Sequence, residues 1–160
     1  MKLVLMQLLT DCEIAALATA CGITYEEAKK AIRWKDLPGE LENPIYGNPE
    51  NLYLALIKLG FWKKNIVLSD LLSGKATPGK TIVLIHKPTN PISQQHWVVW
   101  AGKNDKGKHL FFWGDSEKPV TVSEKSLSDY YCKGWPNCAF EVYKASVWRL
   151  WWQKIIKVFS

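Results

Sequence analysis

The sequence predicts a single α+β domain in which N-terminal helices pack on an antiparallel sheet. Its 160 residues are enough for one domain with one substantial core. Helix signals fill the first part of the chain, whereas short β-type runs dominate after Gly60. These runs do not alternate regularly with helices as βαβ units do, so the order of elements argues against a parallel sheet.

Three helices are expected before Gly60. Residues 11–21 are rich in Ala and Leu and contain no helix breaker, which predicts a buried helix. The sequence Thr24-Tyr-Glu-Glu27 has the spacing of a capping box and predicts a second helix to about Arg33. An Asn-Pro pair supplies an N-cap and a first-turn proline for a third helix over about 48–60.

The later residues predict the sheet. Thr81-Ile-Val-Leu-Ile-His86 is a continuous apolar run typical of a central strand. Two aromatic-rich runs, 96–101 and 109–113, flank the polar segment 103–107, which predicts a β-hairpin. The other expected elements are a strand over 61–68, a helical turn over 69–73, a strand near Val120, a helix over 123–131, a strand over 140–143 and a helix over 147–159.

Composition excludes several classes of protein. The net charge is +6, but the lysines are scattered, and the chain has no zinc-finger spacing, P-loop or aromatic-basic motif. We therefore expect no nucleic-acid partner and no cofactor. No stretch is long enough for a membrane span, and Asp11 and Glu13 interrupt the apolar N-terminal run that a signal peptide would need.

The four cysteines do not form a metal-binding pattern. They are Cys12, Cys21, Cys132 and Cys138, and no two of them have CxxC spacing, so we expect no zinc site. Cys132 and Cys138 are compatible with a short disulfide loop or with two free thiols. Free thiols are favoured in the absence of a secretion signal.

Cys12 stands where the first helix is expected to begin. A thiol there lies at the positive end of the helix dipole, which favours the thiolate and predicts a lowered pKa. The alternative is a small buried residue in an Ala-rich helix.

The hairpin adds two candidate catalytic residues. If it turns around Asp105-Lys106, paired residue numbers sum to about 211, which places His96 opposite Asp115 on the same face. A carboxylate beside an imidazole fixes its tautomer and stabilises the imidazolium during nucleophilic catalysis. The alternatives are a half-buried strand histidine and a turn-forming aspartate. Of the other histidines, we expect His86 to be structural and His109 to be exposed.

The blocks Gln7…Asp11-Cys12-x-Ile-Ala-Ala-Leu-Ala, Thr24-Tyr-Glu-Glu-Ala28 and His96-Trp-Val-Val-Trp resemble the papain-like peptidases of the double-glycine-leader family, especially their stand-alone bacterial and bacteriophage relatives. The resemblance covers about residues 5–125. It implies that Cys12 is the nucleophile, His96 the base and Asp115 the residue that orients the base. It also implies that Gln7 contributes to the oxyanion hole and that the substrate is a peptide or protein.

Two departures from that family favour a second hypothesis. Glu13 stands where the family has glycine, and the spacing from Gln7 to Cys12 is one residue shorter. The alternative function is therefore a weak or inactive peptidase-like assembly protein, for example a virion component. The protein is expected to be cytoplasmic or virion-associated.

The C-terminal segment suggests how such a protein would bind. We expect a peptidase domain over 1–145 and an amphipathic helix over 146–160, whose apolar stripe includes Trp148, Trp151 and Trp152. This helix either docks on the domain or contacts a protein partner or a membrane surface.

Overall fold

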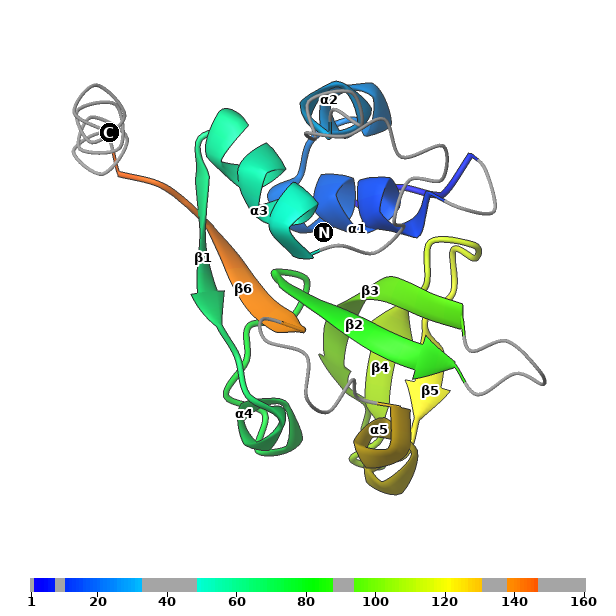
Figure 1. The fold of residues 1–160 in the computed structure, drawn as a ribbon. Coiled ribbons are helices and arrows are strands. Elements are labelled where there is room, and N and C mark those ends of the chain that lie inside the picture. The colour runs from blue at the N-terminus through cyan, green and yellow to red at the C-terminus, as the bar shows by residue number, and fades with distance from the viewer. Residues whose placement is uncertain (1, 8–10, 33–48, 88–93, 131–137, 147–160) are drawn as a thin grey trace.

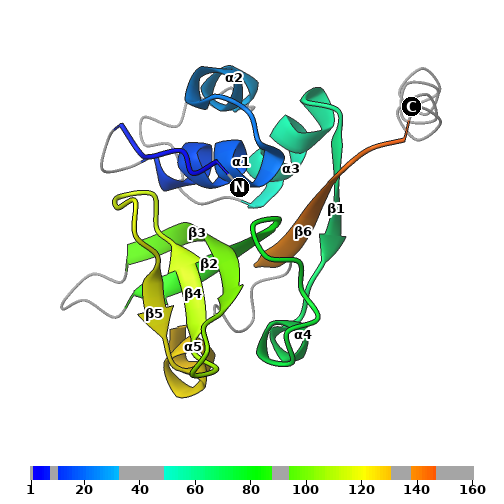
Figure 2. The same cartoon turned by 180° about the vertical axis from the view of Figure 1, so that it is seen from behind.

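The computed structural model describes residues 2–7, 11–32, 49–87, 94–130 and 138–146. Three helices, α1 (Cys12–Cys21), α2 (Tyr25–Ala31) and α3 (Pro49–Lys58), lie together on one side of a sheet, as Figures 1 and 2 show from opposite directions. Two short helices, α4 (Leu68–Leu72) and α5 (Glu124–Tyr130), lie on the other side.

The sheet in the described part of the chain has six strands in the order β1-β6-β2-β3-β4-β5, and every neighbouring pair is antiparallel. The predicted α+β class, with N-terminal helices packed on an antiparallel sheet, is confirmed. The strands are β1 (Phe61–Asn65), β2 (Thr81–Lys87), β3 (Gln94–Lys103), β4 (His109–Phe112), β5 (Val120–Val122) and β6 (Ala139–Lys144).

Local signals in the sequence set the helix boundaries. The side chain of Thr24 accepts a hydrogen bond from the Glu27 N–H at 3.2 Å, and the Glu27 carboxylate accepts one from the Thr24 N–H at 2.8 Å. Both bonds of the predicted capping box are therefore present at the start of α2. At the end of α1, Gly22 adopts a φ of 73° and donates its N–H to Ala18 O, because glycine takes this left-handed conformation without a steric penalty.

The sheet separates two hydrophobic clusters because alternate residues of each strand point to opposite faces. Trp97 and Val99 of β3 pack with α1, α2 and α3 in the larger cluster. Val98 and Trp100, their neighbours in the chain, pack in the second cluster with Leu71 of α4 and Leu127 of α5. Strands β2 and β3 are thus buried on both faces, which explains their nearly continuous apolar sequence.

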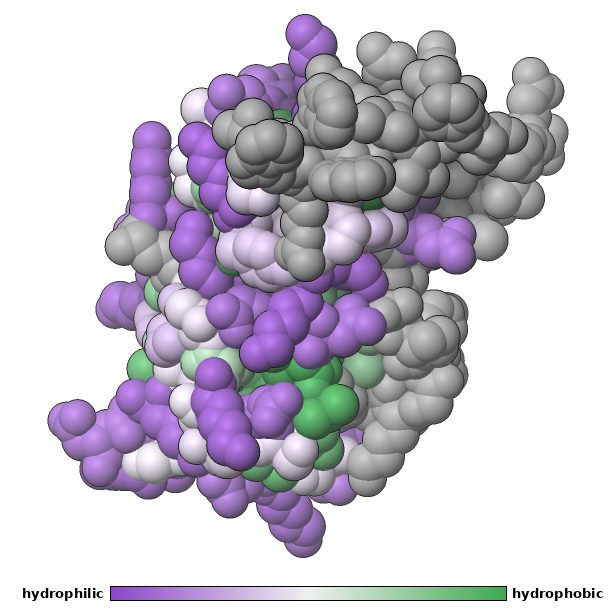
Figure 3. All heavy atoms as spheres, turned by 90° about the vertical axis from the view of Figure 1, so that its left-hand side faces the viewer, coloured by the Kyte–Doolittle hydropathy of each residue, from purple (hydrophilic) through white to green (hydrophobic). Residues whose placement is uncertain are grey.

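The face drawn in Figure 3 is largely hydrophilic, with a small apolar area in its lower half. Among the described residues, the most exposed large hydrophobic side chain is Val67, the N-cap residue of α4. None of the helices in the described ranges has the length and apolar character that a membrane crossing requires.

Two predictions fall outside the described residues. One is the C-terminal helix over 147–159 with Trp148, Trp151 and Trp152. The expected domain boundary at residue 145 therefore stays a prediction. The other is the state of Cys132, although Cys138 itself is a buried free thiol.

Candidate active site

Cys12 is the first residue of α1, and its side chain reaches the start of β3. The Trp97 N–H donates to Cys12 Sγ at 3.5 Å. At Trp97, β3 is no longer paired with β4, because the β3–β4 pair nearest the start of β3 is Val99–Phe112. The thiol therefore contacts the edge of β3 beside the peptide unit that joins His96 to Trp97.

The environment of Cys12 opposes its ionisation. Burial, together with the negative charges of Glu13 and Asp11, raises the pKa of the thiol to about 11, although the hydrogen bond from the Trp97 N–H acts in the opposite direction. Asp11 and Glu13 are only 4% and 1% exposed. The pKa lowering predicted from the helix start is therefore wrong for the resting thiol, because burial and two adjacent carboxylates outweigh the helix dipole.

His96 lies on β3 opposite Ile85 of β2 and is half-buried. Since Trp97 points into the larger core cluster, the preceding side chain points to the other face of the sheet. There the imidazole lies against the indole of Trp113, with ring centroids 5.8 Å apart and planes inclined by 54°. The His96 backbone is thus next to the Cys12 sulfur, and its ring rests on the segment that follows β4.

The predicted hairpin register holds only in part. Residue numbers sum to 211 at Val99–Phe112 and Trp100–Phe111, as expected, but a bulge shifts the pairing by one nearer the turn. The ladder then stops three positions before His96, so Asp115 is not its ladder partner. Asp115 lies two residues beyond Trp113, is exposed, and borders an open hollow of about 500 Å³.

The N-terminal segment brings Gln7 to the same end of the molecule. Met6 donates its N–H to Gly114 O at 2.7 Å, and the Gln7 N–H donates to Asp11 Oδ2 at 3.2 Å. Gly114 has a φ of 82°, and a Cβ there would lie 2.8 Å from Met6 Cγ, so both its conformation and its packing require glycine. The bond to Asp11 therefore links Gln7 to the start of α1. The bond from Met6 to Gly114 links the N-terminal segment to the residue before Asp115.

The overall architecture matches solved peptidase structures. The peptidase domain of Streptococcus mutans ComA superimposes with a TM-score of 0.56 at 19% identity, covering 89% of this chain and 99% of that domain. The chain has the fold of the ComA peptidase domain. A second structure, the peptidase domain of Streptococcus ComA, described as a bi-functional ABC transporter involved in quorum sensing, gives 0.59 at 20% identity, covering 90% and 97%. No family model matches the chain, and neither does any curated protein.

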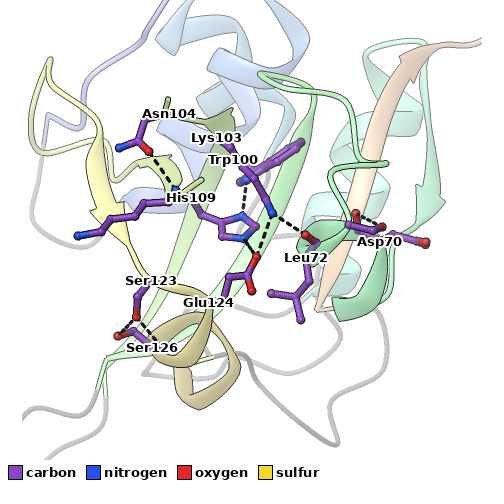
Figure 4. A network of polar contacts seen from close by, with 11 residues as sticks. Asp70, Leu72, Trp100, Lys103, Asn104, His109, Ser123, Glu124 and Ser126 are labelled. Carbon is purple, nitrogen blue, oxygen red and sulfur yellow. Dashed lines mark hydrogen bonds and ion pairs between the residues drawn. The ribbon is translucent and has the colours of Figure 1, made fainter. Parts of the chain in front are cut away.

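Within this ComA-type fold, His109 occupies a different environment from the one expected. It is 0% exposed, so the prediction of a surface residue is wrong. Trp100 Nε1 donates to His109 Nδ1 at 3.1 Å, and His109 Nε2 lies 3.9 Å from the Glu124 carboxylate, which also binds Lys103 Nζ at 3.0 Å (Figure 4). Burial and the charge of Lys103 lower the pKa of His109. The imidazole is thus held neutral inside a structural network.

Two further residues belong to the site and were not predicted to. Tyr25, the first residue of α2, donates its hydroxyl to Asp11 Oδ2. Asp11, next to the candidate nucleophile, accepts this bond and the one from Gln7. The residue pattern alone gives no sign of this contact, because it joins two helices. The described residues contain no group of three or more His, Cys, Asp or Glu side chains arranged to hold a metal ion.

Proposed function

We propose that this protein is a cysteine peptidase that cleaves a peptide bond through a thioester intermediate. Cys12 is the nucleophile, and His96 is the base and acid. Asp115 orients the imidazole, and Gln7 contributes to the oxyanion hole. The observation that carries the proposal is the contact of Cys12 Sγ with the β3 backbone directly after His96, in a chain with the ComA peptidase fold.

The first half of the reaction forms the thioester. The thiol proton passes to His96 as Cys12 Sγ bonds to the carbonyl carbon of the peptide. The carbonyl oxygen becomes an oxyanion, which the Gln7 side chain and the Cys12 N–H stabilise by hydrogen bonds. His96 then gives its proton to the leaving amine as the C–N bond breaks.

The second half hydrolyses the thioester. Water attacks the carbonyl carbon, its proton passes to His96, and the C–S bond breaks to release the carboxylic acid. The proton returns to Cys12 Sγ. Because the resting thiol has a pKa of about 11, proton transfer to His96 must accompany attack rather than precede it as free ionisation. The Trp97 N–H supports this step by donating to the sulfur as negative charge develops there.

A complex peptide mixture tests the proposal without knowledge of the natural substrate. The mixture is incubated with the wild-type protein, and new peptide termini are identified by mass spectrometry. We expect cleavage that falls by about a thousandfold or more in Cys12→Ala, because the nucleophile is lost. Cys21→Ala, in the same helix but buried at its other end, is the matched control and retains activity. Equal cleavage by Cys12→Ala would contradict the proposal.

A second function is supported by the charge around the thiol. Two buried carboxylates beside Cys12 and the raised pKa favour a peptidase-like scaffold that assembles with a partner instead of cleaving it. In that case the working surface would be the proposed C-terminal helix over 146–160, through a protein or membrane contact. This hypothesis predicts a stable oligomer or complex that Cys12→Ala leaves intact and that truncation after residue 145 abolishes.

A further inference from the structure

Asp11 occupies the N-cap position of α1 but does not serve as a cap. Its φ and ψ of −107° and 30° are not the extended values usual at that position, and its side chain makes no capping bond to the helix. The carboxylate is buried, at 4% exposure, next to a thiol whose ionisation it opposes. Helix capping therefore does not explain an acidic residue here.

The bonds of the Asp11 carboxylate indicate what it does. Its Oδ2 accepts the Gln7 N–H at 3.2 Å and the Tyr25 hydroxyl. Tyr25 is itself buried, at 7% exposure, and it is the first residue of α2. Burial and the neighbouring carboxylate raise the pKa of Tyr25, so its hydroxyl stays protonated and keeps donating. One oxygen atom thus links the N-terminal segment, α1 and α2.

The position of Gln7 depends on this link. Upstream, the Val4 N–H donates to Thr19 Oγ1 at 3.0 Å, and Met6 is bound to Gly114. In the described part of this segment, the last hydrogen bond along the chain is the one that the Gln7 N–H donates to Asp11. The Gln7 side chain beyond it is exposed. An oxyanion donor acts only when it is held at the place where charge develops, and a displacement of about 1 Å can lower the rate about a hundredfold.

We infer that Asp11 and Tyr25 are positioning residues that hold Gln7 in place for oxyanion stabilisation at Cys12. The inference rests on the proposed function, because an oxyanion forms only if Cys12 attacks a carbonyl group. It explains why a carboxylate that opposes thiolate formation stands beside the nucleophile.

Two reactions of the same sulfur atom separate positioning from a general structural role. Acetylation by p-nitrophenyl acetate forms an oxyanion, whereas alkylation by iodoacetamide does not. Both are measured at Cys12 by mass spectrometry. We expect Asp11→Asn to accelerate alkylation, because a nearby negative charge is removed, and to slow acetylation at least tenfold relative to alkylation. Tyr25→Phe should lower the ratio of the acetylation rate to the alkylation rate in the same way, with little change in the alkylation rate itself.

Thr24→Ala is the matched control, since it removes the capping box beside Tyr25 without touching Asp11. It should leave the ratio of the two rates unchanged. If Asp11→Asn and Tyr25→Phe also leave that ratio unchanged, the inference is wrong.

Amide exchange distinguishes failure of this inference from failure of the proposed function. If the wild-type protein is not acetylated at Cys12, the peptidase proposal fails, but the link can still be measured. The Gln7 amide should exchange at least tenfold faster in Asp11→Ala and in Tyr25→Phe than in the wild type or Thr24→Ala. Equal exchange in all four proteins would overturn the positioning role whatever the activity.

Discussion

His96 and His109 belong to the same β3–β4 hairpin but occupy opposite kinds of environment. His109 is fully buried, with one ring nitrogen accepting from Trp100 and the other facing Glu124. His96 is half-buried at the end of the hairpin where the ladder has stopped and a thiol meets the strand. Neutral His109 holds elements together, whereas the His96 backbone lies beside the peptide unit that Cys12 Sγ contacts, and its ring lies against Trp113.

Burial acts in the same direction in both regions, since it lowers the pKa of His109 and raises that of Cys12. In each case the neutral form is favoured. The regions differ in what a proton transfer would achieve. Protonating His109 would place two donors, Trp100 Nε1–H and Nδ1–H, against each other. Moving a proton from Cys12 to His96 would create two opposite charges that stabilise each other.

The largest effect on stability is expected at His109. His109→Ala should lower the free energy of unfolding by about 3 kcal/mol, because it leaves a cavity and removes the acceptor of a buried Trp100 N–H. Urea unfolding measures this loss. His109→Gln, which keeps an acceptor and a donor, should lose less. A loss below about 1 kcal/mol in His109→Ala would show that the network is not structural.

Acid should weaken the protein through the same residue. Because the pKa of His109 is lower in the folded state than the ordinary 6.5, the unfolded chain takes up this proton first as the pH falls. The stability from neutral His109 is therefore complete above about pH 6.5 and is lost below it, down to the lowered pKa. Unfolding at pH 7.5 and pH 5 tests this, and the loss on acidification should be smaller in His109→Phe. Identical pH dependence in the two proteins would contradict it.

A smaller effect is expected at the exposed edge of the network. Lys103 bonds to Leu72 O at 2.7 Å and to Glu124 at 3.0 Å, but the Glu124 side chain is 59% exposed. Lys103→Met should therefore cost less than about 1 kcal/mol at neutral pH. It should also raise the pKa of His109, since the Lys103 charge lowers it, and NMR titration of the imidazole measures that shift. A lower pKa in the variant would contradict this description of the network.

Features set by short stretches of sequence were predictable. The capping box at Thr24–Glu27 and the hairpin around residues 103–107 depend on neighbours in the chain, and both are present. The order of elements also sufficed for the fold class. Cys12 could be placed at a helix start because the Ala-rich run has a clear beginning.

Features that depend on packing between distant elements were not predictable. His109 was expected at the surface because it lies near a turn. In the structure it is buried and contacts Trp100 of β3 and Glu124 of α5. Gly102, with a φ of 104°, is the kind of residue that allows a bulge, but it does not fix by itself where the register shifts, and the early end of β4 has no sequence signal. The Tyr25–Asp11 bond likewise depends on how α1 and α2 meet, and the burial of Glu13 is a property of the folded chain.

The pH dependence of Cys12 alkylation by iodoacetamide, in the wild type and in His96→Ala, tests most directly whether these two residues act together. If they do, the wild-type rate should show a His96-dependent rise near neutral pH, where histidine ordinarily titrates. His96→Ala should lose that rise and react appreciably only as the pH approaches the thiol pKa of about 11. Superimposable profiles, both rising only toward pH 11, would contradict the pairing of Cys12 with His96.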